Sequence, residues 1–561
     1  MNNASLELGG DNWAAKDGNL LGYAVGDSSG KYVPNEFTFT RGSNLSATRV
    51  NEDGYIEKGY ENLLLQSNSF TTSPWNISET KYNLTSGQAG YDGSNDAWFL
   101  EKITTSNNYF GQSVVSVGSV YTVSLRAKAD SANSGILLFF GTPFLNVDLE
   151  AKNVYARRNS IFDSVTDIGN GWVEIVFTFV ASSTSTNFQP TTNNLTGQTG
   201  SIYIQDFQIN QGLVAYPYIE TTAASVGAGV LENEPRIDYS SGTASLLLEP
   251  QRTNLITYSE YITSVNNGST SYNATESPEG LLNAPIFTAT SADPFVRSAN
   301  FSITTGDTYT MSFYIKGFGT SIGKTCGASA TTLGGTTFTL TGSWQRISYS
   351  EVSTSTRTNA QLRVDAPNVG AVVGEQFSVW GMQVEQASYP TSYIPTYGVS
   401  QTRADDLGST IDILANPIAF GANDDFTFYY EGSFDKDGNN GMVFGGGNAG
   451  FGNDYRNYLW LTANGMLLKG NSETSMASVT FNQAKNTNYK LLVKRGGSRI
   501  DFFINGTKIP TTQNSTNTAF TLRSVGWSYS NTVYQVSGNI KQFKALPTAL
   551  NDNECIELTT I

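Results

Sequence analysis

The sequence predicts an all-β protein built from tandem antiparallel β-sandwiches in an elongated arrangement. The first observation is composition: 55 of the 561 residues are glycine, 12% of the chain is aromatic and only 14% is charged. This mixture favours short strands and tight turns over helices held by salt bridges. The second observation is the alternation of apolar and polar residues in many short segments, and the third is that several of these segments recur in the same order.

The N-terminal part, residues 1–60, is rich in turn-forming residues and has few large apolar side chains, among them Trp13 and Leu20. We expect no independent core there. The remaining chain is long enough for several domains.

Two copies of one domain are predicted over residues 61–222 and 253–397. Each copy closes on a Tyr-Pro pair, and four segments before it match in the same order. The matches are Glu61-Asn-Leu-Leu-Leu-Gln-Ser67 with Thr253-Asn-Leu-Ile-Thr-Tyr-Ser259, Tyr121–Lys128 with Tyr309–Lys316, Gly171–Phe177 with Ser343–Tyr349, and Phe207–Gln211 with Met382–Gln386. In the second segment Tyr121, Val123 and Leu125 share one face of a strand. Thr122 and Ser124 lie on the other face, so we expect sandwiches with one buried and one solvated face.

Three tryptophans of the repeat are interpreted as core packing residues, with stacking on a sugar as the alternative. Trp172 and Trp344 occupy equivalent positions, and Trp380 lies in a strand-like segment of the second copy. Large aromatic side chains in alternating strands are usually buried.

The connectors are expected to be structured. Residues 223–252 contain a hairpin signal at Ser241-Gly242, followed by an extended run, and are interpreted as a β junction. Residues 398–424 are interpreted as a linker, in which Asp405-Asp406 forms a solvated acidic turn or holds an ion.

The C-terminal block, residues 425–561, begins a third pattern of strands. Asn505-Gly506 predicts a hairpin turn, Gly538–Phe543 predicts the last strand, and the segment from Leu546 to Ile556 predicts a short helix.

Several classes of function are excluded by composition. The chain has no histidine and two cysteines, Cys326 and Cys555, so histidine bases, imidazole metal sites and thiolate clusters are absent. The formal net charge of −15 disfavours binding to nucleic acid and to anionic membranes. No apolar run is long enough for membrane insertion, and we see no secretory signal.

Aromatic residues in two loop-like segments of the C-terminal block are the candidate glycan-binding residues, because an aromatic face can stack on the C–H surface of a sugar. The alternative is that they pack these loops. The candidates are Trp527, Tyr529, Asn531, Trp460, Tyr455 and Asp454.

Metal and catalytic motifs are weak. Asp435-Lys-Asp437-Gly-Asn-Asn440 begins like a calcium loop but lacks its later ligands, so a hairpin turn is the preferred interpretation. We find no paired-carboxylate motif, and we therefore expect no enzyme and no cofactor; structural calcium is left open without assigned ligands.

The repeated segments, with Arg236-Ile-Asp-Tyr239 before the second copy and Tyr389-Pro390 at its end, resemble tail- and head-fibre proteins of tailed bacteriophages. The resemblance implies tandem jelly rolls similar to carbohydrate-binding modules. The C-terminal block, around Asp501–Gly506 and Gly538–Phe543, resembles a laminin-G or concanavalin-A-like lectin domain.

This resemblance implies a structural and adhesive protein on the virion surface. It implies that residues 1–60 dock to other virion proteins, that host surface polysaccharide is bound without turnover, and that the chain forms a homo-oligomer, with a trimer favoured. Three alternatives stay open. The first is a purely structural head or tail component without sugar binding, and the second is a polysaccharide depolymerase with two carboxyl groups in one groove. The third is a secreted bacterial adhesin, which the missing secretory signal disfavours.

Overall fold

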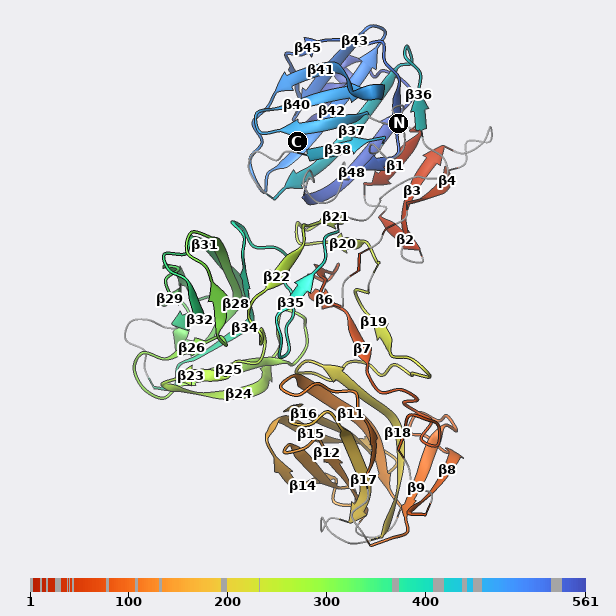
Figure 1. Ribbon diagram of the computed structural model, residues 1–561, viewed down its shortest axis with the longest axis vertical. Helices are drawn as coiled ribbons and strands as arrows, with labels where there is room; N and C mark the ends of the chain where they lie inside the picture. The colour runs from red at the N-terminus through yellow and green to blue at the C-terminus, as the bar shows by residue number, and fades with distance from the viewer. Residues whose placement is uncertain are drawn as a thin grey trace. The chain divides into compact units, whose positions relative to one another are not determined.

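The computed structural model describes residues 4–10, 13–16, 19–25, 32–37, 39, 41–42, 45–76, 80–105, 109–130, 134–192, 199–231, 233–365, 373–406, 418–435, 441–446, 457–525 and 537–561. Within these residues the chain consists of strands β1–β48, one α-helix and short 3-10 turns (Figure 1). The prediction of an all-β protein of antiparallel sheets is confirmed. None of the described helices is long and apolar enough to cross a membrane.

The chain divides into two compact units that do not follow the linear order of the sequence. The first unit combines Met1–Lys58, Val230–Arg252 and Thr402–Ile561, and the second combines Gly59–Gly229 with Thr253–Gln401. The two sandwiches of the repeat are therefore two insertions into one discontinuous unit.

The first unit is a sandwich of two sheets around one apolar core. The larger sheet contains β1 (Leu6–Gly9), β2 (Ala14–Lys16), β3 (Asn19–Val25), β4 (Tyr32–Phe37), β20 (Arg236–Asp238), β21 (Ser245–Leu248), β37 (Phe426–Phe434), β42 (Asn488–Gly496), β43 (Arg499–Ile504), β44 (Thr507–Ile509) and β48 (Gly538–Leu546). The smaller sheet contains β38 (Gly441–Gly445), β39 (Tyr458–Thr462), β40 (Gly465–Gly470), β41 (Thr474–Thr480), β45 (Thr512–Gln513) and β47 (Ser524–Val525). A short ladder joins β36 (Ile418–Phe420) to β46 (Phe520–Leu522).

The N-terminal strand and the junction hairpin complete the edge of this larger sheet. Leu8 of β1 pairs with Phe543 of β48, and Leu246 of β21 pairs with Ile540 of the same strand. Both leucines are buried in the common core. Residues 1–60 are thus no separate segment as the sequence suggested, because their apolar side chains find a core only in the C-terminal domain. Likewise Arg403 and Asp406, in the expected linker, are buried.

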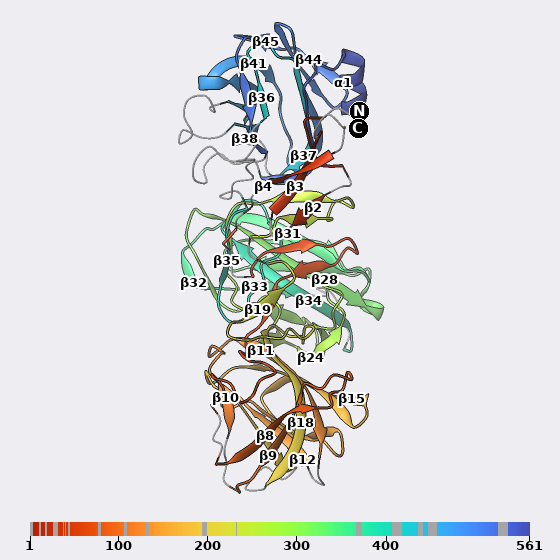
Figure 2. The same cartoon turned by 90° about the vertical axis from the view of Figure 1, so that its right-hand side faces the viewer.

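The C-terminal helix α1 (Asp552–Thr559) begins later than the sequence predicted. Asn551 caps its first turn, accepting a hydrogen bond from the backbone N–H of Glu554 at 3.0 Å. Figure 2 shows α1 beside β44, and Cys555 is buried there against Phe503.

The second unit contains the two predicted sandwiches. The first has a six-stranded and a five-stranded sheet: β15 (Ser160–Gly169), β16 (Trp172–Val180), β11 (Val120–Ala129), β18 (Gly200–Gln211), β9 (Ala97–Lys102) and β8 (Tyr82–Gln88), facing β10 (Phe110–Gln112), β17 (Thr186–Thr192), β12 (Ser134–Phe139), β13 (Phe144–Asp148) and β14 (Asn153–Arg158).

The second sandwich repeats this plan with five strands in each sheet. They are β24 (Gly268–Thr275), β25 (Ala284–Ala289), β34 (Gln376–Glu385), β28 (Thr308–Phe318) and β31 (Gln345–Val352), facing β23 (Ser264–Asn266), β26 (Phe295–Arg297), β33 (Leu362–Asp365), β29 (Thr325–Ala330) and β30 (Gly335–Thr339).

Short ladders outside the large sheets of the chain join β5 (Thr48–Val50) to β6 (Ile56–Lys58), β7 (Tyr60–Asn62) to β19 (Val226–Ala228), β22 (Arg252–Asn254) to β35 (Gln401–Arg403), and β27 (Phe301–Ile303) to β32 (Arg357–Ala360).

The repeated sequence motif is a buried hydrogen-bond clamp. In the first sandwich the amide of Asn62 donates to the carbonyl oxygens of Phe207 and Ile219, at 3.3 and 2.9 Å. In the second sandwich Asn254 donates in the same way to Met382 and Ile394, at 3.1 and 2.9 Å. The motif therefore secures the segment that follows the last strand of each sandwich, and this structural role explains why it recurs.

That clamped segment covers the face of β11 that we expected to be solvated. Thr122 is buried and donates its hydroxyl to the carbonyl oxygen of Gly212 at 2.8 Å, and Ser124 is buried too. The alternation of the strand was predicted correctly, but both of its faces are covered here.

The three tryptophans of the repeat are not core residues as expected: Trp172 and Trp380 are buried outside the apolar cores, in this outer layer, and Trp344 is half-buried. Trp172 is 2% exposed and packs at its edge against Tyr91, and Trp380 is fully buried against Tyr393. Neither belongs to the apolar core between the sheets. Trp344 is half-buried, and its indole N–H donates to the carbonyl oxygen of Glu276 at 2.9 Å.

Candidate functional site

The outer face of the five-stranded sheet in the first sandwich carries amide side chains next to aromatic rings. Along β12, Ile136 and Leu138 point into the core, so Leu137 and Phe139 point away from it. In the register of the sheet Leu137 lies between Asn146 of β13 and Gln189 of β17. The three side chains form one row across three strands.

The two amides of this row are buried without a partner. Asn146 and Gln189 are both fully buried, and neither the oxygen nor the nitrogen of either amide makes a hydrogen bond within the described residues. A buried polar group left in this state costs about 1–3 kcal/mol. Two such groups, one on each side of Leu137, indicate a place where water or hydroxyl groups of a ligand complete the hydrogen bonds.

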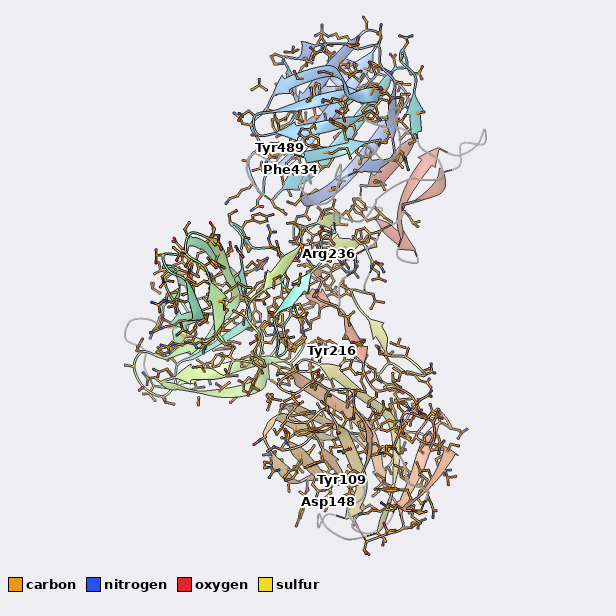
Figure 3. The ribbon with its side chains drawn as sticks, viewed as in Figure 1. Tyr109, Asp148, Tyr216, Arg236, Phe434 and Tyr489 are labelled. Carbon is orange, nitrogen blue, oxygen red and sulfur yellow. The ribbon has the colours of Figure 1, made fainter. Side chains whose placement is uncertain are left out.

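An aromatic platform adjoins the amides. The rings of Tyr109 and Phe139 are stacked, with centroids 5.6 Å apart and planes 21° apart. Phe144 is paired with Phe139 across β12 and β13, and the guanidinium of Arg158 lies 5.3 Å from the centre of its ring. Tyr109, labelled in Figure 3, is 37% exposed, so solvent reaches its side of the platform.

This combination suits the recognition of a polyhydroxylated ring. Aromatic faces stack on apolar C–H surfaces, and amides both donate and accept hydrogen bonds. The described part of the face carries one carboxylate, Asp148, which lies beside Gly135 in the register. The chemistry of these side chains suits the binding of a sugar, and two opposed carboxyl groups, which glycoside hydrolysis uses, are not found among the described residues of this face.

Of the residues predicted from the sequence, Trp460 is described and the other five are not. Trp460 is half-buried on the outer face of β39, with Tyr458 at a ring-centroid distance of 5.4 Å and buried Met442 beside them. Trp527, Tyr529, Asn531, Tyr455 and Asp454 lie outside the described residues. A small aromatic cluster is therefore present at Trp460, and the rest of that predicted site stays a prediction.

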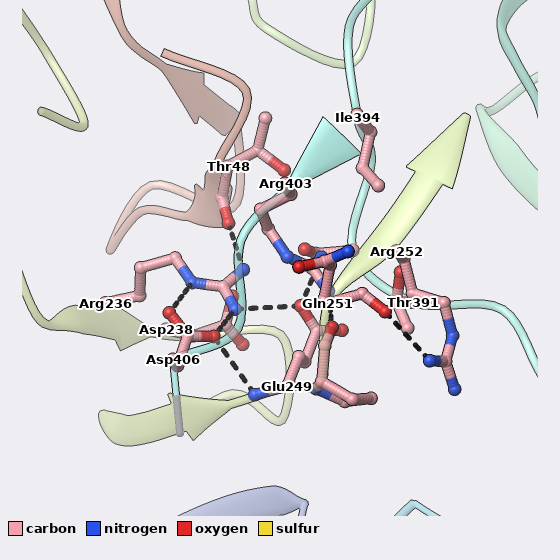
Figure 4. A network of polar contacts seen from close by, with 12 residues as sticks. Thr48, Arg236, Asp238, Glu249, Gln251, Arg252, Thr391, Ile394, Arg403 and Asp406 are labelled. Carbon is pink, nitrogen blue, oxygen red and sulfur yellow. Dashed lines mark hydrogen bonds and ion pairs between the residues drawn. The ribbon is translucent and has the colours of Figure 1, made fainter. Parts of the chain in front are cut away.

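A cluster of buried charges occupies the junction in the first unit (Figure 4). Asp406 accepts hydrogen bonds from Arg236 and, at 2.9 Å, from Arg41, while Glu249 is ion-paired with Arg236 at 2.9 Å and with Arg403 at 2.8 Å. The arginine charges hold the pKa of Asp406 below its ordinary value despite its burial. The solvated acidic turn expected at Asp405-Asp406 is therefore wrong for Asp406, whose carboxylate is bound by arginines.

Asp435, the first residue of the segment that begins like a calcium loop but was expected to be a hairpin turn, is half-buried in the same unit. Burial, and next the charge of Glu249, raise its pKa to about 7. It follows β37, which lies in the larger sheet, whereas β38 after the loop lies in the smaller one. A hairpin joins two strands of one sheet, so the expectation of a hairpin between β37 and β38 is wrong. Residues 436–440 lie outside the described residues.

The described residues contain no group of three or more acidic or cysteine side chains arranged for a metal ion. Two acidic side chains lie in one loop of the first sandwich, at Asp92 and Asp96, with Ser94 between them in the sequence. There the amide nitrogen of Gln205 donates to all three side chains, at 3.2, 3.1 and 2.8 Å. Burial raises the pKa of the neighbouring Asp206 to about 6.

Sequence reasoning missed the platform of the first sandwich. The alternation in Gly135–Phe139 does place Leu137 and Phe139 on one face, but their partners Asn146 and Gln189 come from distant strands. A signal existed in polar residues within otherwise apolar strands, such as Asn146 between Leu145 and Val147.

Comparisons with protein families and with curated proteins find no match. Among solved structures, the chain is similar to the CBM40 module of the Ruminococcus gnavus IT-sialidase bound to α2,3-sialyllactose, with 19% identity over 25% of this chain and 84% of that chain and a TM-score of 0.21. It is similar to the CBM22-1–CBM22-2 tandem of Paenibacillus barcinonensis Xyn10C, with 13% identity, 62% and 100% coverage and a TM-score of 0.19. It is also similar to domains LG4-5 of the mouse laminin α1 chain, with 13% identity, 46% and 91% coverage and a TM-score of 0.18.

Carbohydrate-binding modules and laminin G domains are thus among the structures this chain resembles. The TM-scores are low, and no ligand or activity follows from them. The sandwich fold of each part is defined by its own strand pairing.

Proposed function

We propose that this protein is a non-catalytic glycan-binding protein and that the outer face of the first sandwich is a binding site. The observation that carries the proposal is the pair of buried, unpartnered amides of Asn146 and Gln189 beside the stacked rings of Tyr109 and Phe139. Hydroxyl groups of a sugar satisfy such amides, and the ring face packs on its C–H groups.

We propose further that the bound glycan is not cleaved. Asp148 is the one carboxylate in the described rows of this face. The chain contains no histidine to replace a missing acid or base. We therefore propose adhesion instead of depolymerisation.

We further propose that the protein acts as an adhesive fibre or decoration on the surface of a bacteriophage particle. The support is the resemblance of the repeated motif and of the tandem domain arrangement to phage fibre proteins. Many copies on one particle would turn weak sites into strong attachment by avidity. Immunogold labelling of purified particles tests this placement, and particles without label would contradict it.

Retention on an array of bacterial surface polysaccharides tests glycan binding. The full chain is applied, and released oligosaccharides are measured in parallel. We expect retention without product, and we expect Tyr109→Ala to weaken it by about tenfold because the stacking surface is removed.

Tyr55→Ala is the matched control, since Tyr55 is an exposed tyrosine of the first unit, 43% exposed, and lies outside the sandwich. Trp460→Ala serves as the competing variant for the site predicted from the sequence. Retention lost only in Trp460→Ala would move the site to the first unit. Released product, or no retention of the wild-type chain, would contradict the proposed function.

A further inference from the structure

The second sandwich presents a charged face at the place where the first presents amides and aromatic rings. On β26 and β33 the core residues Val296 and Val364 alternate with residues of the outer face. These outer residues include Arg297 and Arg363, which are directly paired across the two strands. Ser264 flanks Arg297 on β23, and Ser329 flanks Arg363 on β29.

Two arginines opposite each other are an unfavourable pair unless an anion lies between or above them. Both guanidinium groups lie over the same ring, Phe295, with Arg363 at 3.8 Å and Arg297 at 4.6 Å from its centre. Phe295 is 7% exposed, so the ring forms the floor on which both cations converge.

The acids of this face form ion pairs with one of the two arginines, while the charge of Arg297 also acts on the carboxylate of Asp365. Arg363 is ion-paired with Asp365 and, at 3.3 Å, with Asp293. Within the described residues Arg297 takes part in no ion pair, so the N–H groups of its guanidinium are available to donate hydrogen bonds to a ligand. Arg363 keeps 31% of its side chain exposed and Arg297 is half-buried, so both can be reached from solvent.

We propose that this face of the second sandwich binds an anionic sugar group, a carboxylate or a sulfate, of an acidic polysaccharide. The planar guanidinium of Arg297 matches two oxygens of such a group, and the hydroxyls of Ser264 and Ser329 add donors on either side. The proposal rests on the proposed function in that the ligand is a glycan, but the site and its residues are different.

The net charge of the chain makes this binding distinguishable from general attraction. At −15 the protein as a whole repels polyanions, so retention of an acidic glycan requires a local site. A bound anion would relieve the repulsion between Arg297 and Arg363, and salt would weaken the complex.

Affinity electrophoresis of the full chain tests the proposal. Native gels contain polygalacturonate, its fully methyl-esterified form, or dextran sulfate. We expect retardation by at least one of the two polyanions and none by the neutral ester. Retardation by polygalacturonate assigns the site to carboxylates, and retardation by dextran sulfate alone assigns it to sulfates. Arg297→Gln is expected to raise the apparent Kd about tenfold or more.

Arg357→Gln is the control, because it removes the same charge from an exposed position of β32 in the same sandwich. Equal retardation of Arg297→Gln and wild type, equal retardation by the ester, or no retardation by either polyanion would overturn the inference. Tyr109→Ala separates the two proposals: if it abolishes neutral-glycan binding and leaves polyanion binding intact, each face acts alone.

Discussion

At the scale of single residues, the proposed function depends on buried polar side chains. The alternating pattern of β12 and β13 is sufficient by itself to assign Leu137 and Asn146 to the same face. The sequence could not show that Asn146 and Gln189 would share a row without partners, because that depends on pairing between distant strands. It also could not show which of two faces a covering segment would bury.

Asp435 gives a prediction about pH at this scale. Its pKa is about 7 in the folded chain and about 3.9 when unfolded, so the native state binds an extra proton between these values. Stability contributed by this group is therefore present at low pH and is lost as the pH rises toward 7, by up to about 4 kcal/mol.

We expect Asp435→Asn to raise the melting temperature at pH 8 and to leave it nearly unchanged at pH 4. Thermal unfolding followed by circular dichroism at both pH values measures this. Equal shifts at the two pH values would argue that Asp435 is ionised throughout.

At the scale of elements, the clamp of each sandwich gives the clearest link between motif and structure. Asn254 donates to two carbonyl groups and accepts from the backbone N–H groups of Ile256 and Val384, both at 3.1 Å.

Asn254→Ala leaves these buried groups without partners, and we expect a loss of about 2–4 kcal/mol in the free energy of unfolding. Asn300→Ala, at an exposed position of the same sandwich, is the control. Denaturant unfolding with equal midpoints for the two variants would show that the clamp does not stabilise the domain.

Strands and the partners joined to them by a short hairpin were predictable because both signals are local, as for β43 and β44 at Asn505-Gly506 and β20 and β21 at Ser241-Gly242. Partners that lie far apart in the sequence were not predictable. The pairing of β1 with β48 joins residues that lie more than five hundred positions apart. Local propensity contains no information on such contacts, so the sequence alone predicts a separate role for the N-terminal segment.

At the scale of the whole molecule, the discontinuous first unit predicts how the chain can be divided. A fragment of residues 398–561 lacks β1 and β21, and so exposes the edge of β48 and the apolar sites of Leu8 and Leu246. We expect this fragment to aggregate. A chain that joins residues 1–58, 230–252 and 402–561 by short linkers should be monodisperse and unfold cooperatively. Size-exclusion chromatography compares the two, and a monodisperse 398–561 fragment of equal stability would contradict the assignment.

The most direct test of the central claim is hydroxyl-radical footprinting of the full chain with and without the glycan that it retains. The account predicts that oxidation of Tyr109 slows several-fold when the glycan is bound, because its ring is then covered. Oxidation of Tyr55, exposed on the first unit, should not change. Unchanged oxidation of Tyr109 under saturating glycan would contradict binding on this face of the first sandwich.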